Sequence, residues 1–215
     1  MRSCLHPSPS RQNEGGYTLV ALLALMTILA LFAAAAAPSL QQQARREGEK
    51  EAIFRGEQVA EAIRLYYLYK VSKGVTGEPG LPSSIDDLRE GLSVGTKKVQ
   101  ILRGSAARDP LSESGEWQMV RPRSNELIDF LRSVMSFARN IKPETHGQEL
   151  QQLERDMVPP VLPNPRATPT ASSSSSAGNS SGPFIGVSSE DKTHSVLFYY
   201  GIDHHDGWIF TPLFR

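Results

Sequence analysis

The chain has 215 residues, enough for one ordinary domain with attached segments. Lysine plus arginine and aspartate plus glutamate number 23 each, so no overall charge draws the chain to nucleic acid or to an acidic substrate. The one cysteine, Cys4, precedes the first apolar segment, which excludes a disulfide, a thiolate metal site and a cysteine nucleophile from everything after it.

The first predicted element is a long apolar run that begins directly after two glycines, in EGGYTLVALLALMTILALF. Residues 17–44 contain no Asp, Glu, Lys or Arg, whereas residues 45–61 are densely charged. About 20 consecutive apolar residues span a bilayer as an α-helix. Residues 17–37 therefore predict a transmembrane helix.

Three interpretations of this N-terminus are open. The first is a permanent anchor. The second is a cleaved secretory signal peptide, indicated by the small residues of FAAAAAPS and by the basic Arg2 and Arg11. Against it, the apolar run exceeds the usual h-region of about 7–15 residues, and Pro38 follows the expected cut.

The third interpretation is a resemblance. A short polar leader that ends in Gly16, followed by an aromatic-Thr-Leu start, resembles the type IV prepilins, which include the type II secretion pseudopilins. The resemblance implies that a prepilin peptidase cuts after Gly16 and that Tyr17, in place of the usual Phe, becomes the N-methylated first residue. It also implies a helix kink at Pro38, because proline removes one helical backbone hydrogen bond.

One position departs from that family. Its fifth mature residue is usually glutamate, and here it is Ala21. Cleavage leaves a charged amine beside hydrocarbon, where isolated charge is costly and a neighbouring subunit's carboxylate offsets it. A pseudopilin at the filament tip also lacks this glutamate. Ala21 therefore favours a special position in a filament, or an unusual mode of assembly.

The membrane orientation has opposing indications. Counting basic residues near the apolar run would place the C-terminal side in the cytoplasm. The resemblance implies the reverse, with the C-terminal head in the periplasm. The basic residues after the run are interleaved with glutamates in what looks like a continuing helix: Arg45, Arg46, Lys50 and Arg55 with Glu47, Glu49, Glu51 and Glu57.

Residues 41–70 continue with a helical pattern. Residues that recur at steps of three and four define one face, and most of them are small or apolar: Ala44, Gly48, Ala52, Gly56, Val59, Ile63, Tyr66 and Lys70. The lower part of this face is compatible with a solvated stalk, and equally with a helix that packs beside others in a filament.

A loop rich in glycine and proline follows, KGVTGEPGLPSS, and then a short helix whose Ser84 and Asp87 have capping-box spacing. KKVQIL alternates as a strand does, and residues 117–120 predict another strand. The stretch RDPLSESGEW resembles the pseudopilin body through Asp109, Pro110, Gly115 and Trp117. Turn chemistry and inward packing of the tryptophan account for the same residues.

Residues 124–158 predict two helices inserted into the head. Ser124 is a candidate cap for the first, whose apolar face is Leu127, Ile128, Leu131, Val134, Met135 and Ala138. The second carries Leu150, Leu153 and Met157. Residues 159–182 are Pro-rich and then Ser-rich, and predict a disordered loop.

The C-terminal segment, residues 183–215, predicts a meander of three antiparallel strands, PFIGVSS, SVLFYYG and WIFTPLF. These strands would complete a small sheet packed on the upper part of the first helix.

The sequence DHHDG, residues 203–207, is the densest polar cluster and could bind zinc or nickel. Neighbouring histidines on a strand point to opposite faces, so a third ligand such as His194 would be needed, and a hydrogen-bonded turn explains the cluster without metal. Some pseudopilins bind calcium in a late loop, which singles out Asp203 and Asp206. No metal site or cofactor is predicted, and no catalytic motif is present.

Together these patterns predict a pilin-like α+β protein without enzymatic activity. Its segments are a cleaved leader (1–16), a transmembrane helix (17–37), its soluble extension (38–70), a first part of the head (71–123), the helical insertion (124–158), the loop (159–182) and the last strands (183–215). The resemblance implies a minor subunit of a protein-transporting type II secretion pseudopilus or of a type IV pilus, and the absence of glutamate at position 21 favours the tip. Its implied partners are prepilin peptidase, other pilin-like subunits, the inner-membrane assembly platform and lipid. The alternative is a single-pass, membrane-anchored periplasmic binding module that does not polymerise.

Overall fold

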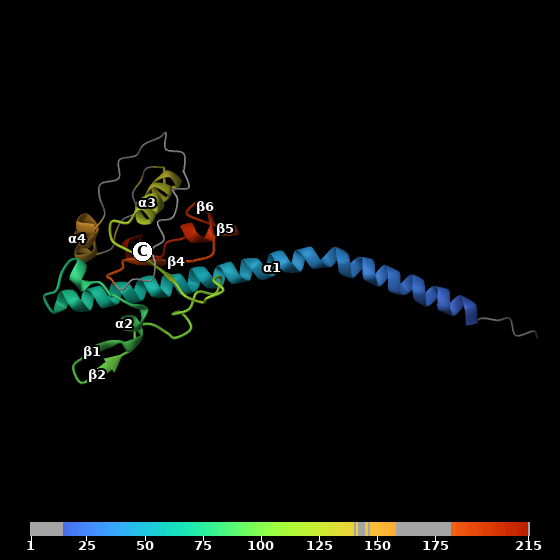
Figure 1. Cartoon of the computed structure of the whole chain (residues 1–215), viewed down its shortest axis with the longest axis horizontal. Coiled ribbons are helices and arrows are strands. Elements are labelled where there is room, and N and C mark those ends of the chain that lie inside the picture. The colour runs from blue at the N-terminus through green and yellow to red at the C-terminus, as the bar shows by residue number, and fades with distance from the viewer. Residues whose placement is uncertain (1–14, 140, 142–144, 146, 158–181, 215) are drawn as a thin grey trace, which may run out of the picture. The chain divides into compact units, whose positions relative to one another are not determined.

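The computed structural model describes residues 15–139, 141, 145, 147–157 and 182–214. The chain divides into two compact units, Met1–Ala44 and Arg45–Arg215, and the helix α1, Gly15–Ser72, belongs to both (Figure 1). Most of the predicted leader and nearly all of the predicted loop 159–182 lie outside the described residues.

The first unit contains the apolar part of α1. Its stretch Tyr17–Ala34 is long and apolar enough to cross a membrane, as the sequence predicts, and none of it is buried. Leucines on every side of the helix are exposed, among them Leu19, Leu23 and Leu29. An uninterrupted apolar sequence explains this, because it has no polar face to turn towards water.

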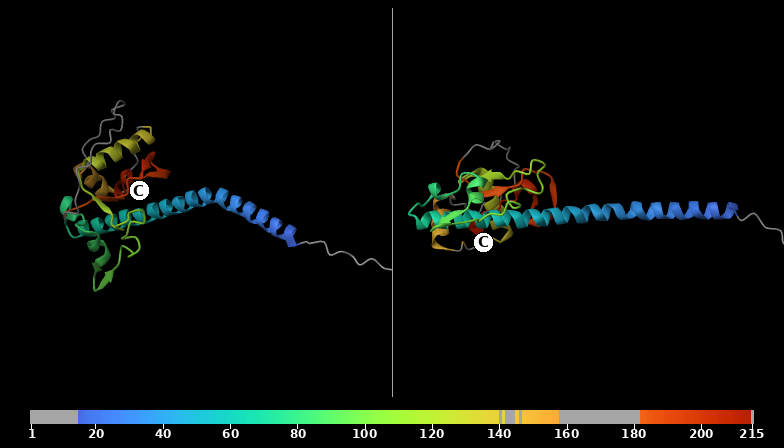
Figure 2. Two further views of the ribbon diagram at one scale, coloured as in Figure 1. Left: turned by 45° about the vertical axis from the view of Figure 1, so that its right-hand side comes forward. Right: turned by 90° about the horizontal axis from the view of Figure 1, so that it is seen from below.

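The second unit, the head, combines helices with small antiparallel sheets. Its elements are η1 (Glu78–Gly80), α2 (Ile85–Glu90), β1 (Leu92–Val94), β2 (Lys97–Val99), β3 (Gln118–Val120), α3 (Asn125–Phe137), α4 (Gln148–Met157), β4 (Gly186–Ser188), β5 (His194–Tyr199), β6 (Ile202–His204), η2 (His205–Gly207) and η3 (Pro212–Phe214). In Figures 1 and 2, α3 and β4–β6 lie on one side of the head part of α1, and α2 with β1–β2 on the other. This mixture fits the predicted α+β class.

Two predicted helix starts are confirmed. Ser84 and Asp87 form a capping box at α2, in which the serine hydroxyl accepts from Asp87 N–H and the aspartate accepts from Ser84 N–H. Ser124 caps α3 by accepting from Leu127 N–H. The buried face of α3 differs in part from the predicted one, since Phe130 is buried and Ile128, Met135 and Ala138 are only partly covered.

The predicted C-terminal meander is wrong. The described strands form three separate two-stranded sheets, β1–β2, β3–β4 and β5–β6. Strand β4 pairs with β3 instead of with β5, and β6 lies in the stretch predicted as a connection. WIFTPLF is not a strand: it makes one isolated bridge, Val187 with Phe210, and ends in η3. Its Pro212 has no N–H to donate to a ladder, which limits pairing at this point.

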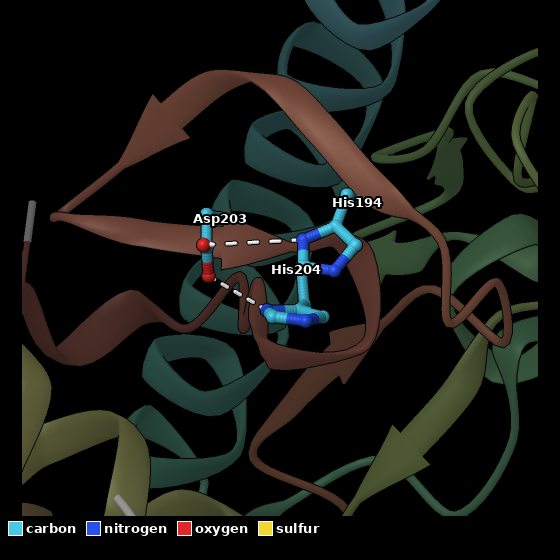
Figure 3. A group of neighbouring side chains, drawn as sticks. All are labelled: His194, Asp203 and His204. Carbon is cyan, nitrogen blue, oxygen red and sulfur yellow. Dashed lines mark hydrogen bonds and ion pairs between the residues drawn. The ribbon is translucent and has the colours of Figure 1, made fainter.

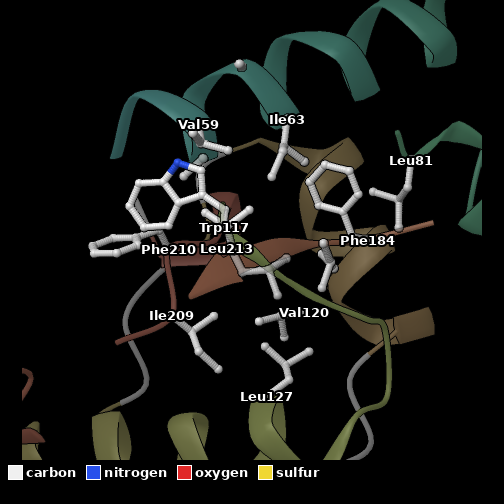
Figure 4. Packing of buried hydrophobic residues seen from close by; sticks show 14 of the residues in the cluster. Val59, Ile63, Leu81, Trp117, Val120, Leu127, Phe184, Ile209, Phe210 and Leu213 are labelled. Carbon is white, nitrogen blue, oxygen red and sulfur yellow. The ribbon is translucent and has the colours of Figure 1, made fainter. Parts of the chain in front are cut away.

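The core of the head forms against one face of α1. Figure 4 shows Val59 and Ile63 of α1 directed at a cluster that includes Trp117 and Phe210. The ring of Trp117 meets Phe210 edge-on, with centroids 5.8 Å apart, and its Nε1–H donates to Ala106 O at 3.0 Å. Trp117 therefore packs inward as predicted.

The small residues of α1 have a packing role within the head. Ala52 and Gly56 are buried, and a Cβ added at Gly56 would overlap Cδ2, Cγ and Cε2 of Phe210, well inside the 3.0 Å that real Cβ contacts respect. The face around Gly56 is thus neither a solvated stalk nor a surface for another subunit, because the chain's own Phe210 covers it.

Candidate functional site

The two residues predicted for processing lie at the start of the described part of α1. The helix is described from Gly15 onwards, so Gly16 and Tyr17 are both in its first turn. The side chain of Tyr17 is 82% exposed. The predicted cleavage position therefore immediately precedes the apolar stretch that is long enough to cross a membrane.

The apolar stretch carries no carboxylate where the resemblance expects one. Ala21 is exposed, and Tyr17–Ala34 contains no charged residue. The hydroxyl of Thr27 donates to Ala24 O at 2.8 Å, one turn earlier in the same helix. A hydroxyl satisfied by its own helix suits an environment without water, because no other partner is required there.

Glu49, on the head part of α1, is a buried carboxylate that holds strand β5. Only 2% of the residue is exposed. Its Oε1 accepts from Val196 N–H and its Oε2 from Leu197 N–H, both at 2.7 Å. Hydrogen bonds to a charged acceptor are about twice as strong as neutral ones. Glu49 therefore fastens the middle of β5 to α1 through the backbone.

His205 extends this fastening to the loop before β5. Its Nε2 lies 3.2 Å from Oε1 of Glu49, and its Nδ1 lies 2.9 Å from Oδ2 of Asp191. Both ring nitrogens thus face carboxylate oxygens, and both donate when the imidazole is protonated. With its side chain only 5% exposed, His205 links α1 to the β5–β6 hairpin from inside the head.

The two aspartates near this network have opposite pKa shifts. Burial acts to raise the pKa of Asp191, but hydrogen bonds from the Thr193 side chain and backbone, and from His205, outweigh it and lower the pKa. Burial raises the pKa of Asp109, and the hydrogen bond from Ser189, 2.6 Å long, offsets only part of that effect. This hydrogen bond connects the turn that contains Asp109 to Ser189, the residue that follows β4.

The network has the residue types of a catalytic triad but not its connections. Thr193 Oγ1 lies 3.2 Å from Nδ1 of His205, whose other nitrogen faces Glu49. The threonine hydroxyl, however, donates to Asp191 Oδ2 at 2.7 Å, and a nucleophile must donate to its base. The geometry therefore explains these residues as a structural fastening.

The predicted polar cluster DHHDG is divided between two environments. His205 is buried in the network, whereas His204 is 44% exposed, so the two neighbouring histidines point apart as predicted. Across the hairpin, His194 reaches His204 and Asp203, with the imidazole centroids 4.1 Å apart (Figure 3). Asp206, singled out with Asp203 for calcium, is not part of this group among the described residues.

The burial of Glu49 was not predicted, because the sequence pattern groups it only with the charged residues interleaved along the continuing helix. A signal for it exists in the sequence. Glu49 precedes Ala52 by three residues and Gly56 by seven, so it continues the buried face of α1 one turn towards the N-terminus. A carboxylate on an otherwise small and apolar face indicates a buried partner.

No protein-family model matches the sequence, no curated protein matches it, and no solved structure matches its fold. The function is therefore argued from the chain's own residues. Two features carry that argument: an exposed apolar helix segment, and a head fastened to the same helix by Glu49.

Proposed function

We propose that the chain is a pilin-like structural subunit, a minor subunit of a type II secretion pseudopilus or of a type IV pilus. The observation that supports this most is the double use of α1. Its stretch Tyr17–Ala34 is apolar and unburied, and further along the same helix Ala52, Val59 and the residues around them form part of the core of the head. A helix that serves only as a membrane anchor does not have to continue into the core of the domain that it anchors.

The proposed mechanism is an exchange of environments. Before assembly, lipid covers the exposed apolar surface of Tyr17–Ala34. Assembly replaces these lipid contacts by contacts with the corresponding helices of other subunits. The head is carried along, because the Glu49 hydrogen bonds and the packing of Phe210 at Gly56 join it to the helix.

The position in the filament follows from Ala21. A subunit in the middle of a filament has neighbours on both sides, and the family's glutamate offsets a neighbour's charged terminal amine. Ala21 provides no carboxylate. The proposal therefore places this subunit at the tip, with its head in the periplasm and its helix derived from the inner membrane.

The first test is processing. The full chain is co-expressed with a prepilin peptidase, and the mature N-terminus is identified by mass spectrometry. We expect the chain to begin at N-methylated Tyr17, the Gly16→Leu variant to retain its leader, and the control Gly15→Ala to be processed normally. A Gly16→Leu variant that still has the mature size contradicts the proposal.

Two other outcomes identify the competing interpretations. An uncut wild-type N-terminus supports a single-pass binding module that does not polymerise, the alternative favoured by the absence of a carboxylate at Ala21. A chain that begins near Ala37 and is soluble without detergent supports a secreted protein. Because cleavage does not prove assembly, crosslinking to co-expressed pilin-like subunits is the second experiment, and the incorporated subunit should crosslink through α1.

A further inference from the structure

Two histidines face each other across the exposed β5–β6 hairpin. His194 and His204 are partners in the strand register, and the adjacent backbone bond runs from His205 N–H to Thr193 O. That bond pattern makes the histidines a non-hydrogen-bonded pair, the kind in which opposite side chains approach most closely. The backbone therefore holds both imidazoles side by side, with centroids 4.1 Å apart.

A carboxylate completes the group. Asp203 Oδ1 lies 2.7 Å from Nδ1 of His204, and its Oδ2 lies 3.9 Å from Nδ1 of His194 (Figure 3). The neighbour of His204 on a regular strand would point to the other face, but the register between β5 and β6 is irregular here. One ligand atom from each of the three residues lies within 4.8 Å of the others.

We propose that His194, Asp203 and His204, named here the hairpin cluster, bind one divalent transition-metal ion of the zinc class. The ligand types decide the class of ion, because two imidazole nitrogens suit Zn²⁺ and Ni²⁺, whereas Ca²⁺ takes oxygen ligands. This assignment is independent of the proposed function, since it depends only on the head.

The distances fit such an ion after small side-chain rotations. Tetrahedral zinc with bonds of about 2.0–2.1 Å separates its ligand atoms by about 3.3 Å. The contact between Asp203 and His204 is shorter than this and the contact between Asp203 and His194 is longer, so the carboxylate has to move from the one imidazole towards the other. The side chain of Asp203, the one that has to move, is 51% exposed, which leaves room for this rotation on its solvent side.

The ion would join the start of β5 to the end of β6. It would replace the contact between His204 Nδ1 and Asp203 Oδ1, and it leaves one coordination position to water. His205, the next residue after His204, is buried against Glu49, so an ion at the hairpin cluster would staple the hairpin beside the point where it is fastened to α1.

The experiment measures zinc binding by the full chain in detergent micelles, purified with an affinity tag that contains no histidine. The background carries Cys4→Ser, His6→Gln and His146→Gln, which remove the single thiol of the chain and the two histidines outside the described residues. Competition with a chromophoric zinc chelator should give one Zn²⁺ per chain. The visible spectrum of the Co²⁺ complex reports whether the coordination is tetrahedral.

Single replacements test each ligand. We expect His194→Ala, His204→Ala and Asp203→Asn each to weaken zinc binding at least about tenfold. Asp206→Asn, the matched control on an exposed carboxylate of the same segment, should leave it unchanged. Far-UV circular dichroism confirms that the variants fold, as their exposure predicts.

Three results would overturn the proposal. The first is a wild-type background that does not compete with the chelator for zinc. The second is unchanged affinity in the double variant His194→Ala, His204→Ala. The third is displacement of Zn²⁺ by equimolar Ca²⁺, which would reject a transition-metal site.

Discussion

Two glycines on α1 should respond in opposite directions to the same substitution. Gly56 lies under the ring of Phe210, and an added Cβ would overlap three of its ring atoms. At Gly48 the nearest atom to an added Cβ is Leu111 Cδ2, 4.0 Å away, which is an ordinary contact. Both glycines lie inside the same helix, so replacing either one by alanine gains a similar free energy from helix propensity.

The loss of stability expected for Gly56→Ala depends on how tightly the ring of Phe210 is packed. The ring is 1% exposed and is held by Trp117 and Tyr199, with ring centroids 5.8 and 5.2 Å away, so it cannot swing aside without moving the core. Forcing an extra methyl group into a packed site costs about 1–3 kcal/mol, and alanine returns roughly 1 kcal/mol of helix propensity. Because three ring atoms are overlapped at once, the upper part of this range, about 2–3 kcal/mol, applies at Gly56. We therefore expect Gly56→Ala to destabilise the head by about 1–2 kcal/mol net, and Gly48→Ala to stabilise it by roughly 0.5–1 kcal/mol.

Thermal unfolding of the full chain in detergent micelles measures both effects. Trp117 and Trp208 are buried in the head, so their fluorescence reports its unfolding. A difference of about 2 kcal/mol between the variants separates their Tm values by about 4–8 °C for a domain of this size. Replacing Phe210 by Leu should reduce the cost of Gly56→Ala, since it removes the ring that the methyl group meets.

The result that refutes this reasoning is a Gly56→Ala variant at least as stable as the wild type. Stabilisation of both variants to the same extent would mean that helix propensity alone governs this face. The packing of Phe210 onto α1 would then be wrong.

Two further predictions concern the polar network. Glu49→Ala should destabilise the head by about 3 kcal/mol, because two backbone N–H groups lose their carboxylate acceptor. The control is Glu47→Ala, an exposed position on the same helix, which should change the unfolding free energy by less than about 0.5 kcal/mol. Equal values for both variants in urea unfolding would show that Glu49 does not attach β5 to α1. The pKa of Asp191 is lowered in the folded state, so its contribution to stability is complete above the unfolded-state pKa of about 3.9 and is lost as pH falls through the lower folded-state value. The difference in unfolding free energy between wild type and Asp191→Asn should therefore shrink as the pH falls below about 4. A difference that grows between about pH 4 and about pH 2 would contradict this sign.

Features with local causes could be predicted from the sequence. The capping box of Ser84 and Asp87 and the cap at Ser124 depend on residues within one helical turn of each other. The turn from Asp109 to Gly115 is closed by a backbone bond of 3.1 Å between those two residues. In each case the chemistry that forms the structure lies in consecutive residues, so a pattern in the sequence is sufficient.

Features that depend on distant partners could not be predicted. Gln118 of β3 pairs with Ser188 of β4, and nothing in either three-residue strand specifies the other. Strand β2 has the alternating pattern that predicts a strand, and it is exposed. The apolar run WIFTPLF, which contains the buried Phe210, was also predicted as a strand but makes one isolated bridge. Alternation and apolar content report burial and propensity, but pairing is set by the tertiary environment.

The hairpin cluster illustrates the same limit in a binding site. DHHDG attracts attention as a sequence, yet its neighbouring histidines separate, one into the core and one to the surface. The partner of His204 is His194, which only the register of the hairpin brings opposite. Spacing along the chain thus indicates the ligand types, and the strand pairing selects which of them can share an ion.

Two positions on α1, Glu49 and Ala21, concern two different requirements of a pilin-like subunit. The head has to stay attached to its helix, and Glu49 meets this requirement within the chain, because donor and acceptor are both its own. A place inside a filament requires a carboxylate for a neighbour's amine, and position 21 holds alanine. A tip subunit has a neighbour on one side only, so the missing carboxylate has no amine to offset there. The proposed cleavage after Gly16 would require only this chain and a peptidase, which is why processing is the sharper of the two expectations.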